Sequence, residues 1–260
     1  MGKENFSSPG VQSWYGNIAK MRVISRILET PGKKTIFDYG AGAGGGWPGT
    51  LAQHPEIQLV AYEPSPSSNS LRQRTPQAVI LGAEELAGDS VGADFIVSFS
   101  VFEHVYDRAA YLANARRHLA DGGTFFLNYD DAHFRKSLDL NRPRSWFGDL
   151  REYTKNAGAG IWPHLGMIGR YQSRVVREDA DAMVAAAGFA TVSVRYENIV
   201  SFKRLSKHVP KHGQAEFSAL WLATEDSLNS EHQHSGSLHY GDEIILWREM
   251  GSRTLELQAL

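Results

Sequence analysis

Residues 35–46 read TIFDYGAGAGGG, and this stretch constrains the fold more than any other part of the chain. It predicts a short buried strand that ends in Asp38 and runs directly into a glycine-rich turn. A second apolar run, residues 58–63 (QLVAYE), closes with Glu63. Glycines in such a turn let the backbone approach a ligand, and an acid at the tip of the next strand accepts hydrogen bonds from ribose hydroxyls. The pattern therefore predicts a nucleoside-binding site.

Composition excludes several other classes of protein. The chain has 260 residues, 42% hydrophobic and 22% charged, which suits one large globular domain or a domain with an added lid. Its net charge of −2 provides no field for attracting nucleic acid. The absence of cysteine excludes disulfides, thiolate nucleophiles and cysteine-bound metal sites. Since the sequence shows no signal-peptide core and no apolar run of membrane-spanning length, we expect a cytoplasmic protein with no nucleic-acid or membrane partner.

Hydrophobic periodicity predicts strands that alternate with helices. The expected helices span 14–29, 47–53, 67–74, 108–119 and 175–187. The expected strands span 36–38, 58–62, 77–81, 93–99, 124–127, 189–196 and 217–223. Such alternation implies a parallel sheet covered by helices on both faces, and the late connections are compatible with an antiparallel last strand.

We expect residues 1–260 to form a single domain with two additions. Residues 130–171 mix charges, aromatic residues, proline and glycine, which indicates an inserted lid that faces the substrate. Residues 225–260 are expected to be a polar tail with one amphipathic piece at 242–250. The apolar side chains at 244–247 would dock either on the core or on a second subunit, so a homodimer is one expected arrangement.

The glycine turn also fits the dinucleotide pattern G-x-G-x-x-G, which is weak evidence when it stands alone. Three features argue against a nicotinamide cofactor. Asp38 would face a pyrophosphate unfavourably, whereas it suits a cofactor with a cationic amino-acid end. The other two features are the run SFSVFEH at 98–104, after the fourth strand, and the run LADGG at 119–123, before the fifth.

With these motifs, the chain resembles the class I S-adenosylmethionine (SAM)-dependent methyltransferases of the small-molecule type over roughly residues 34–130. The similar segments are FDYGAGAG at 37–44, AYE at 61–63, LGAE at 81–84, SVFEH at 100–104 and LADGGT at 119–124. The resemblance implies an α/β fold, a Rossmann-like three-layer sandwich whose mostly parallel seven-stranded sheet has an antiparallel last strand. It also implies SAM as the cofactor and S-adenosylhomocysteine (SAH) as the product.

The resemblance implies a set of cofactor-binding residues: Tyr15, Asp38, Gly40, Ala41, Gly42, Gly44, Glu63, Pro64, Gly82, Ala83, Glu84, Ser100, Val101 and His104. Tyr15 is expected either to close over the methionine end of the cofactor or to pack the first helix on the core. Much of the family has an acid where this chain has Gly82. The adenine is therefore expected to contact backbone groups of Gly82 and Ala83, or Glu84.

His104, His133 and Tyr129 are the expected catalytic residues. His104 follows the fourth strand, at the edge where open α/β sheets bind ligands, and it can orient a substrate or accept a proton. A histidine that starts a helix can equally bond only to backbone. His133 lies in the expected lid, and Tyr129 follows the fifth strand, where loop residues usually carry function. We expect no metal site, because the histidines at 232–239 lie in a polar segment typical of a flexible tail.

These inferences favour methyl transfer to a nitrogen or oxygen atom of a small-molecule acceptor. Two alternatives remain: an NAD(P)-dependent oxidoreductase that uses the G-x-G-x-x-G turn, and a methyltransferase-like fold that binds without catalysis.

Overall fold

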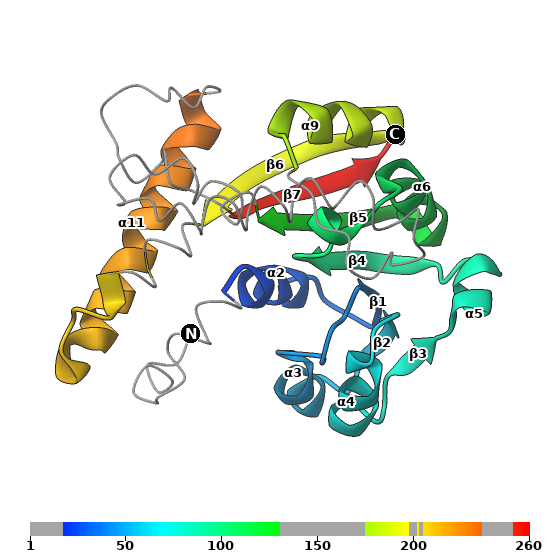
Figure 1. Cartoon of the computed structure of the whole chain (residues 1–260), viewed down its shortest axis with the longest axis horizontal. Coiled ribbons are helices and arrows are strands. Elements are labelled where there is room, and N and C mark those ends of the chain that lie inside the picture. The colour runs from blue at the N-terminus through cyan, green and yellow to red at the C-terminus, as the bar shows by residue number, and fades with distance from the viewer. Residues whose placement is uncertain (1–17, 131–174, 198–201, 203–204, 236–251) are drawn as a thin grey trace, which may run out of the picture.

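The computed structural model describes residues 18–130, 175–197, 202, 205–235 and 252–260 (Figure 1). The helices are α2 (Ile18–Leu28), α3 (Trp47–Gln53), α4 (Ser67–Arg74), α5 (Ala83–Ala87), α6 (Arg108–His118), α9 (Arg177–Ala186) and α11 (Gln214–Ser235), with 3₁₀ turns η2 (Phe102–His104) and η6 (Lys211–Gly213). The strands are β1 (Lys34–Tyr39), β2 (Ile57–Tyr62), β3 (Val79–Leu81), β4 (Ala93–Phe99), β5 (Leu119–Asp130), β6 (Phe189–Glu197) and β7 (Ser252–Ala259).

The seven strands form one sheet in the order β3-β2-β1-β4-β5-β7-β6. The pairs among β1 to β5 are parallel, and β7 runs antiparallel to both of its neighbours, β5 and β6. The chain runs outward from β1 to β3 and then crosses to β4 on the other side of β1. This reversal places a topological switch point between β1 and β4, where ligands bind at the carboxyl ends of the strands. The predicted mostly parallel, seven-stranded Rossmann-like sheet is confirmed.

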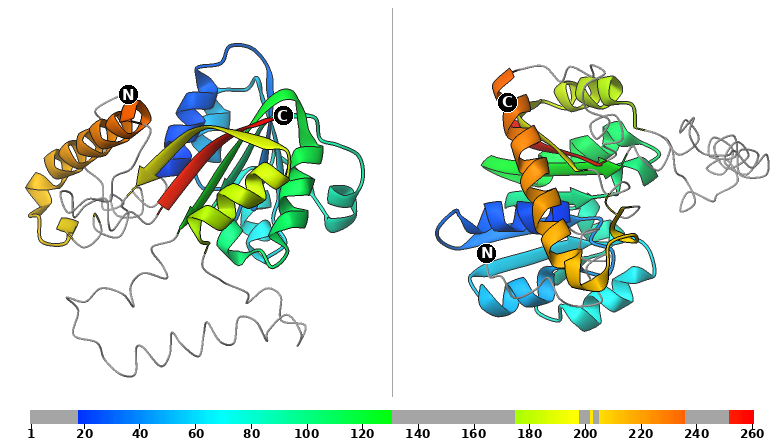
Figure 2. Two further views of the ribbon diagram at one scale, coloured as in Figure 1. Left: turned by 90° about the horizontal axis from the view of Figure 1, so that it is seen from above. Right: turned by 90° about the vertical axis from the view of Figure 1, so that its left-hand side faces the viewer.

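Helices cover both faces of the sheet and make three layers (Figure 2). One face packs against α2 and α3 through a core that includes Ile24, Ile27, Trp47 and Leu51. The opposite face packs against α5, α6 and α9 through a larger core. These cores follow from the sequence pattern, because successive residues of a strand point to opposite faces and both faces are apolar.

Helix α2 ends where glycine and proline break it, and α6 begins at a side-chain cap. Pro31 follows α2, and Gly32 has the positive φ of 92° that suits the end of a helix. The carboxylate of Asp107 accepts the N–H of Ala110 at 2.9 Å, which satisfies one of the free donors at the start of α6. These local signals put both helices close to their predicted boundaries.

The predicted last strand at 217–223 is wrong. That run lies inside α11, and the antiparallel strand is Ser252–Ala259, within the segment expected to be a tail. Strand β5 also continues past residue 127 to Asp130, so Asn128 and Tyr129 lie in the sheet and not in a loop. The segment expected to be the lid lies outside the described residues, except for Asp130.

Helix α11 covers the edge strand β6 by supplying an amide in place of a neighbouring strand. The side chain of Asn229 accepts the N–H of Tyr196 at 2.7 Å and donates to the carbonyl of Tyr196 at 2.9 Å. These two hydrogen bonds satisfy the N–H and the carbonyl of Tyr196 at an edge where unpaired backbone groups could otherwise bind other chains. None of the helices in the described ranges has the length and apolar character needed to cross a membrane.

Candidate functional site

The glycine turn is bonded to the end of β2. The N–H groups of Gly40 and Ala41 both donate to the carbonyl of Tyr62, at 2.9 and 3.1 Å. The N–H of Gly42 donates to Oε2 of Glu63 at 2.7 Å. The structure therefore brings together the turn after β1 and the acid after β2, as the sequence predicts.

Two glycines of the turn are required for different reasons. Gly40 has a φ of 94°, and a Cβ there would lie 2.3 Å from Cγ2 of Val101. Gly42 has a φ of 56°, and a Cβ there would meet no atom within 4 Å. Gly40 thus lets the segment after β4 approach the turn, whereas Gly42 faces open space that a ligand can fill.

Asp38 is buried and already carries an ion pair. Its Oδ2 lies 2.7 Å from Nζ of Lys20 on α2, and it also accepts the indole N–H of Trp47. Asp38 is 1% exposed and Lys20 is 7% exposed. The acid before the glycine turn is therefore held by two side chains that the sequence argument did not single out.

Lys20 nevertheless left a signal in the sequence. Residues 20, 24 and 27 share one face of a helix, and Ile24 and Ile27 make that face apolar. A lysine on that face is expected to be buried, and a buried lysine needs an anion nearby. Trp47 follows three glycines, and the sequence contains no comparable signal that it contacts Asp38.

The segment expected to hold adenine follows β3, and one of its donors is already used. The N–H of Gly82 donates to the carboxylate of Glu85, the third residue of α5, which caps the start of that helix. The side chains of Ala83 and Glu84 are exposed at the same helix start, as is Pro64 after β2. Contact of the adenine with Gly82, Ala83, Glu84 or Pro64 stays a prediction.

The segment after β4 lies beside the glycine turn. Ser100 adopts a positive φ of 53°, unusual for a residue other than glycine, and its N–H donates to the carbonyl of Asn128 at 3.1 Å. His104 closes η2, is exposed, and donates its N–H to the carbonyl of Val101 at 2.7 Å. Val101 fixes this segment against Gly40, so His104 lies at the same edge of the sheet as the turn.

Tyr129 lies in the core, where it does not suit the predicted contact with substrate. The residue is 1% exposed, and Nη1 of Arg253 donates to its hydroxyl at 2.7 Å. Arg253 also pairs with Asp181 at 2.8 Å. Burial raises the pKa of Tyr129 to about 12, although Arg253 opposes the shift. The phenol therefore stays protonated at neutral pH and joins β5, β7 and α9.

Two predicted site residues, Tyr15 and His133, lie outside the described residues. Within the part of the chain that the structure describes, no group of three or more histidine, cysteine, aspartate or glutamate side chains is arranged to hold a metal ion.

Comparison with known proteins identifies the family. Residues 16–194, more than half of the chain, match the family model described as a methyltransferase domain. The chain belongs to this methyltransferase family. The match confirms the cofactor inferred from the sequence, SAM, and removes support from the nicotinamide alternative.

Solved structures share the fold of this methyltransferase at low identity. The cyclopropane synthase MmaA2 from Mycobacterium tuberculosis has a TM-score of 0.56 and 16% identity, covering 98% of this chain and 86% of the other. Phosphoethanolamine N-methyltransferase 2 from Haemonchus contortus, solved with SAM, has a TM-score of 0.53 and 13% identity, covering 100% and 60%. The [4+2]-cyclase SpnF has a TM-score of 0.53 and 14% identity, covering 98% and 84%. No curated protein sequence matches the chain.

The residues of the methyltransferase fit SAM. Each oxygen of Glu63 accepts one backbone N–H, from Gly42 and from Ser65 at 2.8 Å. A carboxylate oxygen has two acceptor sites, so each can still accept a ribose hydroxyl. The open space above Gly42 gives the backbone close access to the cofactor. Glu63 would therefore hold the ribose, and Asp38 the amino-acid end.

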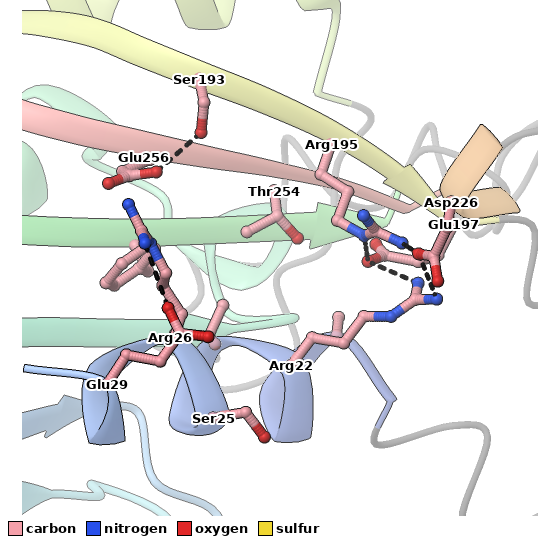
Figure 3. A pocket seen from close by; sticks show the side chains of 13 residues that line it. Arg22, Ser25, Arg26, Glu29, Ser193, Arg195, Glu197, Asp226, Thr254 and Glu256 are labelled. Carbon is pink, nitrogen blue, oxygen red and sulfur yellow. Dashed lines mark hydrogen bonds and ion pairs between the residues drawn. The ribbon is translucent and has the colours of Figure 1, made fainter. Parts of the chain in front are cut away.

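A pocket lies beside α2, away from the glycine turn. This pocket of about 320 Å³ is bounded by α2 and by strands β5, β6 and β7 (Figure 3). Arg22 pairs with Asp226 at 2.8 Å and lies 3.7 Å from the buried Glu197. Burial raises the pKa of Glu197 to about 7, against the opposing effect of Arg195 and Arg22. The charged groups that line the pocket chiefly pair with one another, and these pairs link α2, β6 and α11.

Proposed function

We propose that this methyltransferase transfers the methyl group of SAM to a nitrogen or oxygen atom of a small-molecule acceptor. The observation that carries the proposal is the position of His104. Its imidazole is exposed on the segment that Val101 holds against Gly40. A polar, titratable side chain at this edge can bind or activate an acceptor beside the cofactor.

When bound, SAM supplies a methyl group on a sulfonium, which transfers in line as the acceptor bonds to carbon and the carbon–sulfur bond breaks. A hydroxyl acceptor also releases a proton, and His104 is the residue that we propose accepts it. A neutral amine acceptor needs His104 only for orientation. The chain's remaining contribution is the position of the cofactor, set by Glu63 and Asp38.

A small acceptor is supported by charge. The chain carries a net charge of −2, so it lacks the positive field that attracts RNA or DNA. The similar phosphoethanolamine N-methyltransferase acts, by its name, on a small amine. The net charge thus supports our proposal that the enzyme has no nucleic-acid partner. We also propose that the enzyme is cytoplasmic and that His133 is a second candidate base.

The test is a screen of amines, phenols and small alcohols with methyl-labelled SAM, using the wild type and His104→Gln. We expect label to reach at least one small acceptor. If that acceptor is a hydroxyl, His104→Gln should lower kcat about 10²-fold or more and remove the acid limb of the pH profile. If the acceptor is an amine, we expect His104→Gln to lower kcat by a smaller factor and to leave the acid limb of the pH profile unchanged.

One outcome would favour the non-catalytic alternative. The similarity to a [4+2]-cyclase indicates that this fold also carries chemistry other than methyl transfer. SAH binding without label transfer to any small acceptor would overturn the proposed activity and leave either a binding module or an enzyme that uses this fold for other chemistry.

A further inference from the structure

Lys20 is a buried cation beside the amino-acid end of the candidate cofactor site. It is 7% exposed, and its Nζ lies 2.7 Å from Oδ2 of Asp38. The rings of Trp47 and Phe99 lie 5.3 and 5.8 Å from the ammonium. Helix α2 thus delivers a positive charge to the carboxyl ends of β1 and β4, where the topology places the ligand.

Stability alone gives a weak reason for this arrangement. Burying a lysine and a carboxylate has a desolvation cost that their mutual attraction often only offsets. An ammonium group has three donors, and among the described residues Asp38 is its one hydrogen-bonding acceptor. Aromatic faces stabilise the cation but accept no strong hydrogen bond. Lys20 therefore has donors for a second anion at this position.

Asp38 can likewise accept a further hydrogen bond. Its two described hydrogen bonds, from Lys20 and from Trp47, both reach Oδ2. Oδ1 thus accepts no hydrogen bond from the described residues and has capacity for one from a cationic group. Lys20 and Asp38 together present one positive and one negative group, a pattern complementary to the carboxylate and ammonium of an α-amino acid.

We infer that Lys20 binds the α-carboxylate of SAM while Asp38 accepts its α-ammonium group. The inference rests on the proposed cofactor site and adds to it a residue outside the glycine turn. It makes α2 a part of the site, because the carboxylate contact requires this helix to stay packed on β1 and β4. Lys20 acts by binding and takes no part in proton transfer.

The competing explanation is that Lys20 only neutralises Asp38. In that case its loss weakens every ligand with a methionine-type amino group to the same extent. Ligands that differ in the carboxylate separate the two explanations. Three serve as probes: SAH, the analogue of SAH that lacks the α-carboxyl group, and 5′-methylthioadenosine, which lacks the whole amino-acid end.

The experiment measures the affinity of all three probes by calorimetry for the wild type and for Lys20→Met. We expect the wild type to prefer SAH over its decarboxylated analogue by about 10- to 100-fold, as for a hydrogen bond to a charged group. Lys20→Met should reduce that preference to about threefold or less, and Lys20→Arg should keep most of it. Affinity for 5′-methylthioadenosine should stay within about threefold throughout.

A matched control is Lys34→Met. Lys34 is also buried, 5% exposed, but it lies at the opposite end of β1 and its Nζ donates to the carbonyls of Ile27 and Thr30. This variant should leave the preference for the carboxylate unchanged. If Lys20→Met unfolds because Asp38 is left unpaired, the double variant Lys20→Met/Asp38→Asn removes both charges and should lose the same preference.

Each result bears on a different statement. A preference that persists in Lys20→Met, or in the double variant, overturns the role of Lys20 and leaves the cofactor site intact. Equal weakening of SAH and its decarboxylated analogue also overturns it, in favour of simple neutralisation. Failure of the wild type to bind both SAH and 5′-methylthioadenosine overturns the cofactor site itself, and the inference with it.

Discussion

Oε2 of Glu63 accepts the N–H of Gly42 at 2.7 Å, so the acid after β2 and the turn after β1 are joined by a hydrogen bond. The other oxygen, Oε1, accepts the N–H of Ser65 at 2.8 Å. A carboxylate held at both oxygens has little freedom to turn away, and such preorganisation favours binding. The predicted ribose contact would therefore be made by a carboxylate that backbone N–H groups already hold in place.

The two glycines of the turn should respond differently to alanine. In Gly42→Ala the new Cβ meets no atom, so we expect a loss of roughly 1–2 kcal/mol from the positive φ and at least about tenfold weaker SAH binding. Gly40→Ala adds a contact at 2.3 Å with Val101, which should raise the loss to about 2–5 kcal/mol. Chemical denaturation and calorimetry measure both effects.

The double variant Gly40→Ala/Val101→Ala is the control for that contact. It should recover part of the stability that Gly40→Ala loses. If the double variant is less stable than Gly40→Ala by the full cost of Val101→Ala alone, the close approach between the turn and the segment after β4 is contradicted.

His118 should make the protein less stable in mild acid. Its buried ring accepts the N–H of Val91 at Nδ1 and bonds to the carbonyl of Leu86 at Nε2. Burial lowers the pKa of His118, opposed by the bond to Leu86. Below a pH of about 6.5, His118 therefore binds a proton more readily in the unfolded chain than in the folded chain. The free energy of unfolding thus falls as the pH drops below that value.

The measurement is the free energy of unfolding from pH 5 to 8 for the wild type and His118→Gln. The variant should show a shallower fall toward pH 5. Parallel curves for the wild type and His118→Gln would show that the buried ring titrates normally.

Glu197 should affect the pH dependence of stability in the opposite direction to His118. Because burial raises its pKa from 4.5 to about 7, the folded chain holds a proton there that the unfolded chain has released. Its contribution to stability is complete below pH 4.5 and is lost as the pH rises to about 7. The stability of Glu197→Gln relative to the wild type should therefore increase between pH 5 and 8. A constant difference between the two stabilities over this pH range would refute this.

Asn229 should hold α11 on the sheet. Asn229→Ala leaves both the N–H and the carbonyl of Tyr196 without their described partner, which should cost about 1–3 kcal/mol. Hydrogen exchange should accelerate at Tyr196 and along α11, since this helix covers an edge strand. Ser227→Ala, an exposed change on the same helix, should leave both readouts as in the wild type. Unchanged exchange at Tyr196 in Asn229→Ala would contradict the bridging role.

The first half of the fold could be predicted because its signals are local. Buried strands such as β4 are nearly pure apolar runs, and the glycine turn and Glu63 fall at the strand ends that a parallel sheet places on one edge. The second half depends on distant pairing. Short apolar runs do not distinguish a strand from a helix, so the run at 217–223 predicts a strand although Phe217 and Trp221 are one helical turn apart.

The sequence of β7 contains little that predicts a strand. Only Leu255 and Leu257 are apolar and fully buried in its centre, and the polar residues on either side of Leu255, Thr254 and Glu256, line the pocket beside α2. Its place in the sheet is fixed by β5 and β6, which are far away in sequence. Tyr129 was misplaced for a related reason, because β5 extends through it only when β7 is present as a partner.

The central claim is that Glu63 holds the ribose of SAM. Calorimetric titration with SAH of the wild type, Glu63→Gln and the control Glu56→Gln, an exposed acid before the same strand, tests it most directly. We predict micromolar binding by the wild type and by Glu56→Gln, and binding about 10²-fold weaker in a folded Glu63→Gln, since hydrogen bonds from two ribose hydroxyls to a charged acceptor are lost. Wild-type affinity in Glu63→Gln, or no SAH binding by the wild type, would contradict the account.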